Sequence, residues 1–360
     1  MYTYRKRKRM RRYGACICGL SVLLLLSGCQ TKKNTDSTKS EASVRQDEAS
    51  ETRDIFAMDT YMTLTAYGDH AGEAVDAAVD EIERLDALLS VSDQDGEIYT
   101  LNQNGSEIVS EDTAELIERS LAFYKSTDGL FDITVYPLMD AWGFTTEKYR
   151  VPSQKEIRKL LQRVDASKVS YDAKTRMVTL PDDMEIDLGG IAKGYTSGRV
   201  MDIFRQHGVT SGIVSLGGNV HLCGAKTDGS LWKVAIENPD KSDNYIGVVS
   251  AKDKAVITSG GYERYFEQDG KRWHHILDPR TGWPAESGLS SVSIVSGDGT
   301  LADALSTSLF IMGKEDAISY WKKHADSFDV ILVEGDGSIT ITQGLQDSFQ
   351  SDNPYTVVTE

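Results

Sequence analysis

Two things are scarce in this sequence: cysteine and long runs of apolar residues. Four of the 360 residues are cysteine, and three of these, Cys16, Cys18 and Cys29, stand within the first 29 positions. The remaining Cys223 has no partner for an internal disulfide, so the fold depends on its core, and we expect Cys223 to be a small buried residue on a strand. The apolar stretch that begins at Ala15 is shorter than the roughly 20 residues that a membrane-spanning helix requires.

Basic residues are scarce outside the N-terminus. The chain has 39 basic and 55 acidic residues, a net charge of −16. Seven of the basic residues lie within the first 28 positions, so the remaining chain has 32 basic and 55 acidic residues, a net charge of −23. Binding to nucleic acid relies on a basic face that attracts the phosphate backbone, so this composition argues against a nucleic-acid partner.

The N-terminus has the layout of a bacterial secretion signal. Basic residues at positions 5–12 precede the apolar stretch, and Leu26-Ser27-Gly28-Cys29 resembles a lipobox, in which the cysteine is lipidated and becomes the new N-terminus. We therefore expect residues 1–28 to be a lipoprotein signal peptide and Cys29 to anchor the protein to the cell membrane on its extracytoplasmic side. An uncleaved N-terminal anchor is the alternative, and it leaves the body on the same side.

The segment after Cys29 has the composition of a linker. Residues 30–53 contain no aromatic residue and three apolar ones, Ala42, Val44 and Ala49. Such a composition cannot offset the entropy lost on ordering, so we predict a lipidated flexible tether over residues 29–54. We then expect a single domain over residues 55–345 and a C-terminal tail over residues 346–360.

Apolar periodicity predicts helices and strands in partly separate parts of the chain. Helical spacing occurs over residues 75–89, 114–124, 153–161, 193–207 and 301–312. The third of these opens with a capping box formed by Ser153 and Glu156. β-rich runs occupy residues 58–67, 213–216, 232–236, 246–250, 255–258, 291–295 and 330–333. This partial segregation favours an α+β fold, a single compact domain with mixed or antiparallel sheets, over a doubly wound one.

A glycine-rich stretch, DLGGIAKGY at residues 187–195, leads into one predicted helix. Its spacing matches neither a dinucleotide fingerprint nor a P-loop. Glycines let the backbone approach a ligand, and a helix N-terminus beside Lys193 favours a phosphate, while Asp187 is suited to accept from a base or ribose. A tight strand-to-helix turn with a surface lysine explains the same residues equally well.

Asp303 and Thr307 are four residues apart in another predicted helix, so their side chains share one face. A carboxylate and a hydroxyl suit a hard cation such as Mg²⁺, which takes few protein ligands besides phosphate oxygens. The alternative is an acid near a helix N-terminus and a threonine bonded to its own helix. The spacing alone leaves both open.

His274 and His275 are adjacent, and neighbours on a strand point to opposite faces. They cannot both ligate one ion, which argues against zinc. One of them facing a cleft could move a proton near neutral pH, and the alternative is one surface and one core histidine. Aromatic residues within 128–144 are able to sandwich a planar ring, and the small-residue strand ends at 215–219 and 258–262 suit close approach to a ligand.

Seven motifs follow one another along residues 55 to 345: MDTYMTLTAYG, DGLFDITVYPLMDAWGF, DLGGIAKGY, SLGGNV, TSGGYERYF, HILDPRTG and ADALSTSLFIMG. Together and in this order they resemble the ApbE family of FAD:protein FMN transferases. Seven colinear motifs are far more specific than any one of them. The resemblance implies one compact α+β domain of the T-fold-like ApbE type.

The resemblance also implies an activity. It points to a Mg²⁺-dependent enzyme that takes FAD as substrate, cleaves its diphosphate, attaches FMN through a phosphoester to a threonine of a target protein and releases AMP. Family targets are extracytoplasmic flavin-accepting subunits of redox complexes, which suits a lipoprotein. The alternatives are an FAD hydrolase that yields FMN and AMP, and a lipoprotein that only binds flavin.

The motif positions imply individual roles. Seven residues are implied to contact FAD: Met58, Leu130, Phe131, Asp132, Asp187, Lys193 and Ile276. Leu130 and Ile276 are implied to do so through their backbone. Those implied to hold the metal are Gly190, through its carbonyl, Asp303 and Thr307. His275 matches the histidine proposed in the family as the base for the accepting threonine.

Overall fold

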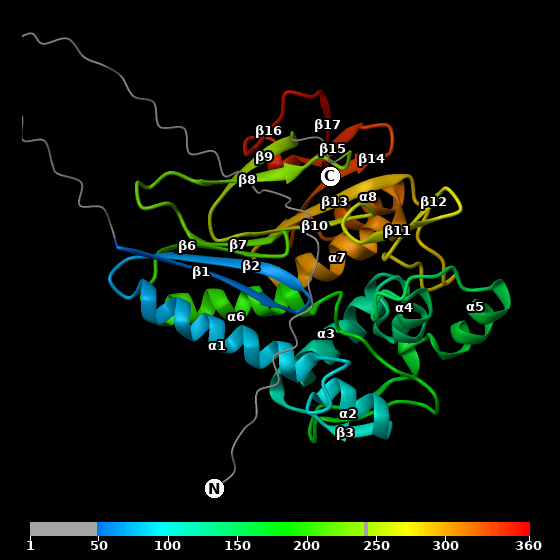
Figure 1. The fold of residues 1–360 in the computed structure, drawn as a ribbon. Coiled ribbons are helices and arrows are strands. Elements are labelled where there is room, and N and C mark those ends of the chain that lie inside the picture. The colour runs from blue at the N-terminus through cyan, green and yellow to red at the C-terminus, as the bar shows by residue number, and fades with distance from the viewer. Residues whose placement is uncertain (1–48, 241–243) are drawn as a thin grey trace, which may run out of the picture. The chain divides into compact units, whose positions relative to one another are not determined.

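A nine-stranded sheet lies at the centre of the structure, a computed structural model that describes residues 49–240 and 244–360 (Figure 1). The described residues belong to one unit. Neighbouring strands of this sheet are antiparallel except for β15 and β17. In spatial order the strands are β1 (Ser50–Ala57), β2 (Thr60–Tyr67), β6 (Ser211–Leu216), β7 (Asn219–Gly224), β10 (Ala255–Gly260), β13 (Leu289–Ser296), β14 (Asp329–Glu334), β15 (Ile339–Thr342) and β17 (Tyr355–Val358).

Three smaller sheets and eight α-helices complete the described part of the chain. The smaller sheets comprise β16 (Phe349–Gln350), β9 (Tyr245–Ala251) and β8 (Trp232–Glu237); β3 (Ser106–Ile108), β5 (Met177–Thr179) and β4 (Ser170–Asp172); and the hairpin of β11 (Tyr265–Gln268) and β12 (Lys271–His274). The helices are α1 (Ala71–Leu89), α2 (Glu97–Asn104), α3 (Glu111–Ser126), α4 (Tyr136–Trp142), α5 (Gln154–Leu160), α6 (Ala192–Gln206), α7 (Gly299–Met312) and α8 (Lys314–Lys322). The α+β class expected from the sequence is confirmed.

Helices cover one face of the large sheet because the strands bury alternate residues toward them. In β2, Met62, Leu64 and Ala66 are buried while the intervening residues are not, and they pack against the apolar stripes of α1 and α6. Helix α7 packs on β10 and β13 through a separate apolar cluster. Figure 1 shows α1 and α6 side by side under β1 and β2, with α7 further along the same sheet.

The opposite face is covered in part by the β16-β9-β8 sheet. Trp232, Val234 and Val249 from that sheet pack against Leu222 and Ile331 of the large one. Cys223, the neighbour of Leu222 on β7, is 2% exposed and faces the helices, as expected for a small buried residue. The centre of the fold therefore has three layers: helices, the nine-stranded sheet and the small sheet.

Two boundaries predicted from the sequence are wrong. Residues 50–54, assigned to the tether, lie in β1, which pairs with β2 along its whole length. Residues 346–360, assigned to a tail, contain β16 and β17, which pair with β9 and β15. Met58, predicted to open the first strand, instead lies with Asp59 in the β1–β2 turn, and both have left-handed backbone angles (φ 47° and 58°).

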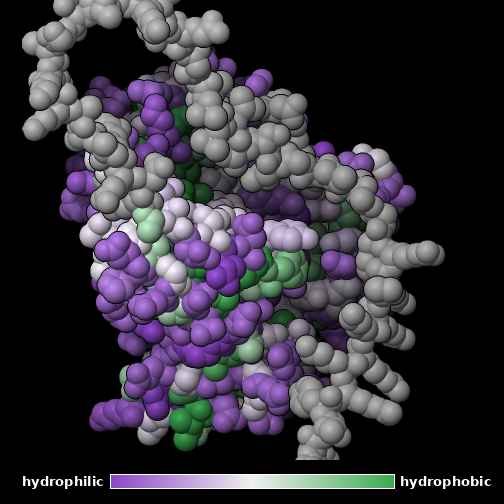
Figure 2. All heavy atoms as spheres, turned by 60° about the vertical axis from the view of Figure 1, so that its left-hand side comes forward, coloured by the Kyte–Doolittle hydropathy of each residue, from purple (hydrophilic) through white to green (hydrophobic). Residues whose placement is uncertain are grey.

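The N-terminal predictions lie outside the described residues. These are the signal peptide over residues 1–28, the lipidated Cys29 and the tether as far as residue 48. Within residues 49–240 and 244–360, no helix combines the length and apolar character needed to cross a bilayer. On the face drawn in Figure 2, hydrophilic side chains predominate among the described residues, and hydrophobic ones form small separate patches.

Candidate active site

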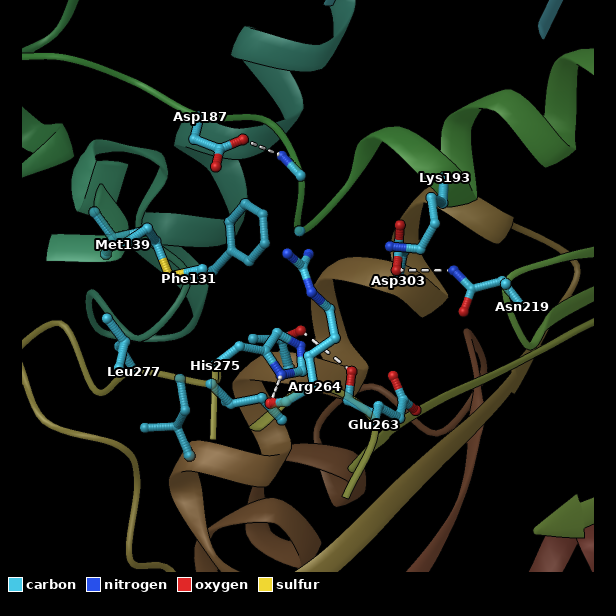
Figure 3. Close-up of a pocket in the computed structure, with 18 of the residues that line it drawn as sticks. Phe131, Met139, Asp187, Lys193, Asn219, Glu263, Arg264, His275, Leu277 and Asp303 are labelled. Carbon is cyan, nitrogen blue, oxygen red and sulfur yellow. Dashed lines mark hydrogen bonds between the residues drawn. The ribbon is translucent and has the colours of Figure 1, made fainter. Parts of the chain in front are cut away.

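A cavity of about 480 Å³ opens where the β1–β2 turn, the first turn of α6, helix α7 and the β11–β12 hairpin meet. Its size is in the usual range of small-molecule sites, roughly 300–1,000 Å³. Figure 3 shows side chains converging on it, among them Lys193 of α6, Asp303 of α7, and Arg264 and His275 at the two ends of the hairpin. The lining includes every described residue implied for the site, namely Met58, Leu130, Phe131, Asp132, Asp187, Gly190, Lys193, His275, Ile276, Asp303 and Thr307.

One wall of the cavity is formed where α6 and α7 cross at Gly194 and Gly299. A Cβ atom on Gly194 would lie 2.2 Å from the Gly299 carbonyl oxygen and 2.6 Å from Cβ of Asp303. Glycine is therefore required for this approach of two backbones. The crossing lets the Gly194 N–H donate to Oδ2 of Asp303 (2.8 Å), which holds the carboxylate beside the N-terminus of α6 and beside Lys193.

Asp303 is the most enclosed acid of this wall, with 5% of its surface exposed. Its Oδ1 accepts a hydrogen bond from the Asn219 side-chain amide (3.1 Å), and burial raises its pKa although Lys193 opposes that effect. Thr307 lies one turn further along α7, and its hydroxyl is 3.3 Å from that of Ser259. The helical spacing thus places Asp303 and Thr307 on one face toward the cavity, as predicted.

Asp132 and Asp187 line the side of the cavity near α4. Both oxygens of Asp132 accept hydrogen bonds from the chain, Oδ1 from the N–H and hydroxyl of Thr134 and Oδ2 from the Ala166 N–H. Asp132 therefore caps its own turn as well as facing the cavity. Asp187 accepts one bond, from the Gly189 N–H to Oδ1 (2.7 Å), and burial raises its pKa. Its Oδ2 has capacity left for a ligand.

His275 stands directly after β12 and is held by the residue that precedes β11. The Arg264 carbonyl accepts hydrogen bonds from the His275 backbone N–H (3.0 Å) and from its Nδ1 (3.1 Å). A carbonyl only accepts, so Nδ1 carries the proton and Nε2 keeps its lone pair. Burial, reinforced by the Arg264 charge, lowers the pKa of His275 to about 3, so the ring is neutral at physiological pH.

His274 points away from the cavity, as the alternation along a strand predicts. Its Nε2 contacts the Ala285 carbonyl (3.1 Å), and its ring packs edge-on against Phe310, 5.6 Å between centroids. His274 is therefore a core residue, and the two histidines do not share a ligand.

The ApbE family description matches residues 58–332, about three quarters of the sequence. The chain belongs to the ApbE family. A Klebsiella pneumoniae protein named FAD:protein FMN transferase is 35% identical over 283 residues, covering 77% of this chain and 87% of its own. One of the same name from Treponema pallidum is 30% identical over 310 residues, 80% of this chain and 85% of its own.

Solved structures of ApbE proteins have the same fold. The ApbE protein of Thermotoga maritima superposes with a TM-score of 0.78 at 34% identity, covering 82% of this chain and 98% of its own. The apo form of the Pseudomonas stutzeri flavinyl transferase ApbE gives a TM-score of 0.74 at 28% identity, with 85% and 98% covered.

The ApbE cavity also contains residues to which the sequence analysis gave no role: Asn219, Ser259, Glu263 and Arg264. All four lie within two of the seven motifs, SLGGNV and TSGGYERYF; Asn219 and Ser259 belong to the small-residue strand ends expected near a ligand, and Glu263 and Arg264 follow the second of these directly. The signal was therefore present in the motifs. Strand alternation alone does not say which charged residue after a strand end turns inward.

The charge of the ApbE cavity fits a divalent cation. Six carboxylates line it, from Asp59, Asp132, Asp187, Glu237, Glu263 and Asp303. Two permanent cations, Lys193 and Arg264, oppose them. An anionic ligand such as a diphosphate would be repelled here without a further positive charge. The carboxylate of Asp303, the hydroxyl of Thr307 and the carbonyl of Gly190 are hard oxygen donors of the kind that Mg²⁺ accepts.

Proposed function

We propose that this protein is a Mg²⁺-dependent flavin transferase that moves FMN from FAD to a threonine hydroxyl of a target protein and releases AMP. One observation carries the proposal: oxygen donors for a cation, a lysine and a neutral histidine with a defined tautomer line a single cavity. The name of the relatives, FAD:protein FMN transferase, supports FAD as the flavin donor and a protein as the acceptor.

In this proposal the wall built by α6 and α7 binds the diphosphate. Asp303, Thr307 and the Gly190 carbonyl would hold Mg²⁺, which would supply positive charge to neutralise phosphate oxygens. Lys193 adds a cation at the N-terminus of α6, where backbone N–H groups and the helix dipole also favour an anion. Phosphoryl transfer depends mainly on such positioning and charge neutralisation.

His275 then acts as the general base. Its Nε2 accepts the proton of the threonine hydroxyl while the hydroxyl oxygen forms a bond to the phosphorus of the FMN half. The bond from that phosphorus to the oxygen of the AMP half breaks, and AMP leaves with the electron pair. The hydrogen bond from Nδ1 to the Arg264 carbonyl keeps the ring oriented and supports the imidazolium that forms.

We further propose that the protein is a lipoprotein anchored through Cys29 and that its targets are extracytoplasmic flavin-accepting subunits of redox complexes. The support is the basic and apolar N-terminus that ends in Leu-Ser-Gly-Cys. Mass spectrometry of the membrane fraction tests this directly. A lipid-modified N-terminal Cys29 is expected, and an N-terminus that retains residues 1–28 contradicts it.

The transferase proposal is tested with residues 30–360, FAD, Mg²⁺ and a flavin-acceptor domain. We expect denaturation-resistant flavin fluorescence on the acceptor and an equal amount of AMP in solution. Replacing the acceptor threonine by valine is the control and should abolish the label. AMP without label would indicate hydrolysis, and FAD retained without either product would indicate a flavin-binding protein.

A further inference from the structure

Glu263 is a cavity residue whose carboxylate has no protein partner. It follows β10 and precedes β11, and it lines the cavity together with Lys193, Asp303 and His275. Among the described residues, no side chain or backbone group makes a hydrogen bond or ion pair with its carboxylate, which is also true of Asp59 and Glu237, whereas Asp132, Asp187 and Asp303 accept hydrogen bonds. An unpartnered acid in a site for an anionic ligand needs a chemical reason.

The local backbone directs Glu263 into the cavity. A Cβ on Gly260 would lie 2.4 Å from the Tyr262 ring, and one on Gly261 would lie 3.1 Å from the His274 ring. The chain therefore turns tightly around two aromatic side chains, and the Glu263 N–H closes the turn on the Gly260 carbonyl (3.3 Å). Tyr262 is buried at 4% exposure, whereas the next residue, Glu263, is exposed and lines the cavity.

Figure 3 shows His275 and Glu263 on opposite sides of Arg264, with Glu263 on the side of Asp303 and Asn219. In an in-line displacement the attacking and leaving oxygens lie on opposite sides of the phosphorus. A base at His275 and an acid at Glu263 would then serve the two ends of that line. The Arg264 guanidinium, which extends from there toward Phe131 in Figure 3, also lines the cavity and is suited to the charge of the transferring phosphoryl group.

We infer that Glu263 is a catalytic residue, the general acid that protonates the AMP oxygen as it leaves. The inference rests on the proposed transfer. As the threonine oxygen bonds to phosphorus and His275 takes its proton, the bond from phosphorus to the AMP oxygen breaks, and that oxygen takes the proton of the Glu263 carboxyl. Glu263 ends as a carboxylate and His275 as an imidazolium, and one proton returned through solvent restores both.

The charges around Glu263 agree with this role. Desolvation by the surrounding protein raises the pKa of Glu263 to about 7, and the charges of Glu237 and Asp303 raise it further, while Lys193 and Arg264 lower it. A bound diphosphate would act in the same direction as these acids, and Mg²⁺ at Asp303 in the opposite direction. His275 and Glu263 are thus shifted in opposite directions, one toward a free base and the other toward a proton-bearing acid, as in other acid–base pairs.

The test is the pH dependence of AMP release and acceptor labelling at saturating FAD and Mg²⁺, between pH 5 and 9. The acid is active when protonated. The wild-type rate should therefore decrease on the alkaline side, at or above pH 7, with the slope expected for the loss of a single proton. Glu263→Gln should lower the maximal rate about 100-fold and abolish that fall. Glu263→Asp should recover part of the rate together with the fall.

Two controls distinguish loss of a general acid from other causes of a lower rate. Glu267→Gln, a neutralised glutamate four residues away on exposed β11, should leave the rate and pH profile unchanged. FAD binding and the Mg²⁺ concentration for half-maximal rate should be the same in Glu263→Gln and wild type. If Glu263→Gln keeps the alkaline decrease in rate, or needs much more Mg²⁺ than the wild type, the assignment of Glu263 as the general acid is wrong. Failure of the wild type to label any acceptor would overturn the proposed function instead.

Discussion

The two walls of the cavity are built differently. The wall of Lys193, Asp303 and Thr307 belongs to two long helices whose backbones touch at a pair of glycines within the main core. Arg264 and His275, in the other wall, flank the two-stranded β11–β12 sheet, which is separate from the large sheet. The first wall is supported by the packing that holds the whole fold, and the second by its own aromatic cluster.

That cluster is compact but peripheral. Trp142 packs with Trp273 and Trp283, at ring-centroid distances of 5.3 and 5.2 Å, and Phe266 of β11 stacks on Tyr149 at 5.3 Å. The difference between the walls predicts separate consequences. Changes at the helix crossing should damage both stability and activity, whereas changes on the hairpin should affect activity more than stability.

The largest effect is expected for Gly194→Ala. The new methyl group would meet the Gly299 carbonyl and Asp303, so α6 and α7 must separate. We expect a loss of about 3 kcal/mol in the free energy of unfolding and a drop of about 100-fold in transfer, since a shift near 1 Å misplaces Asp303. The matched control is Gly198→Ala on the same helix, where no atom lies within 4 Å. Urea unfolding should show the control unchanged or stabilised by about 0.5–1 kcal/mol.

Asp303→Asn should separate activity from stability on the same wall. We expect transfer to fall on the order of 1,000-fold through loss of metal-dependent charge stabilisation. Burial raises the Asp303 pKa in the folded state, so the ionised form costs stability once the pH exceeds the ordinary range of an aspartate. In EDTA the melting temperature of the variant should therefore not be below that of the wild type at pH 7. A clear fall in melting temperature, or unchanged turnover, would contradict the assignment.

His275→Gln tests the hairpin wall. Labelling of the acceptor should fall about 100-fold while the unfolding midpoint stays close to that of the wild type. Because the pKa of His275 is about 3, the base is already unprotonated at pH 5, and the wild-type rate should show no acid limb between pH 5 and 7. If the wild-type rate instead falls on the acid side near pH 6.5, and this fall disappears in the variant, then His275 is solvated like a histidine in an unfolded peptide.

The smallest effect is expected for Tyr149→Ala. Tyr149 is 41% exposed and stacks on Phe266, so its removal should cost about 1 kcal/mol and lower transfer only a few-fold by loosening the hairpin. Tyr245→Ala is the control, an exposed tyrosine on β9 away from the cavity lining. Equal activity losses in the two variants would mean that the aromatic cluster does not orient His275.

Local regularities were predictable from the sequence. The four-residue spacing of Asp303 and Thr307 and the alternation of His274 and His275 follow from helix and strand geometry, and both appear as predicted. The capping box at Ser153 is half confirmed: its hydroxyl accepts from the Glu156 N–H (3.2 Å), but the Glu156 carboxylate pairs with Arg150. Such features depend on neighbours within one turn.

What depends on distant neighbours was missed. The first residues of β1, 50–54, are polar, so composition suggested a tether, whereas the strand is stabilised by backbone hydrogen bonds to β2 at the sheet edge. Residues 355–358, YTVV, are strong β-formers that the sequence analysis did not use, and the parallel pairing of β17 with β15 is set by tertiary structure. Glu263 and Arg264 resemble surface charges until the turn beside Tyr262 brings them into the cavity.

The β11–β12 hairpin joins Arg264 at one end to His275 at the other, and its tip is the two-residue turn of Asp269 and Gly270, both with left-handed backbone angles. The tip is the part of the hairpin furthest along the chain from both ends, and turns of this kind tolerate added groups. A cysteine placed there could carry a fluorescent dye without touching the cavity, and the absence of any other cysteine after residue 29 except the buried Cys223 makes the labelling selective. The hairpin thus offers an attachment point for an optical probe, on the element whose two ends carry Arg264 and His275.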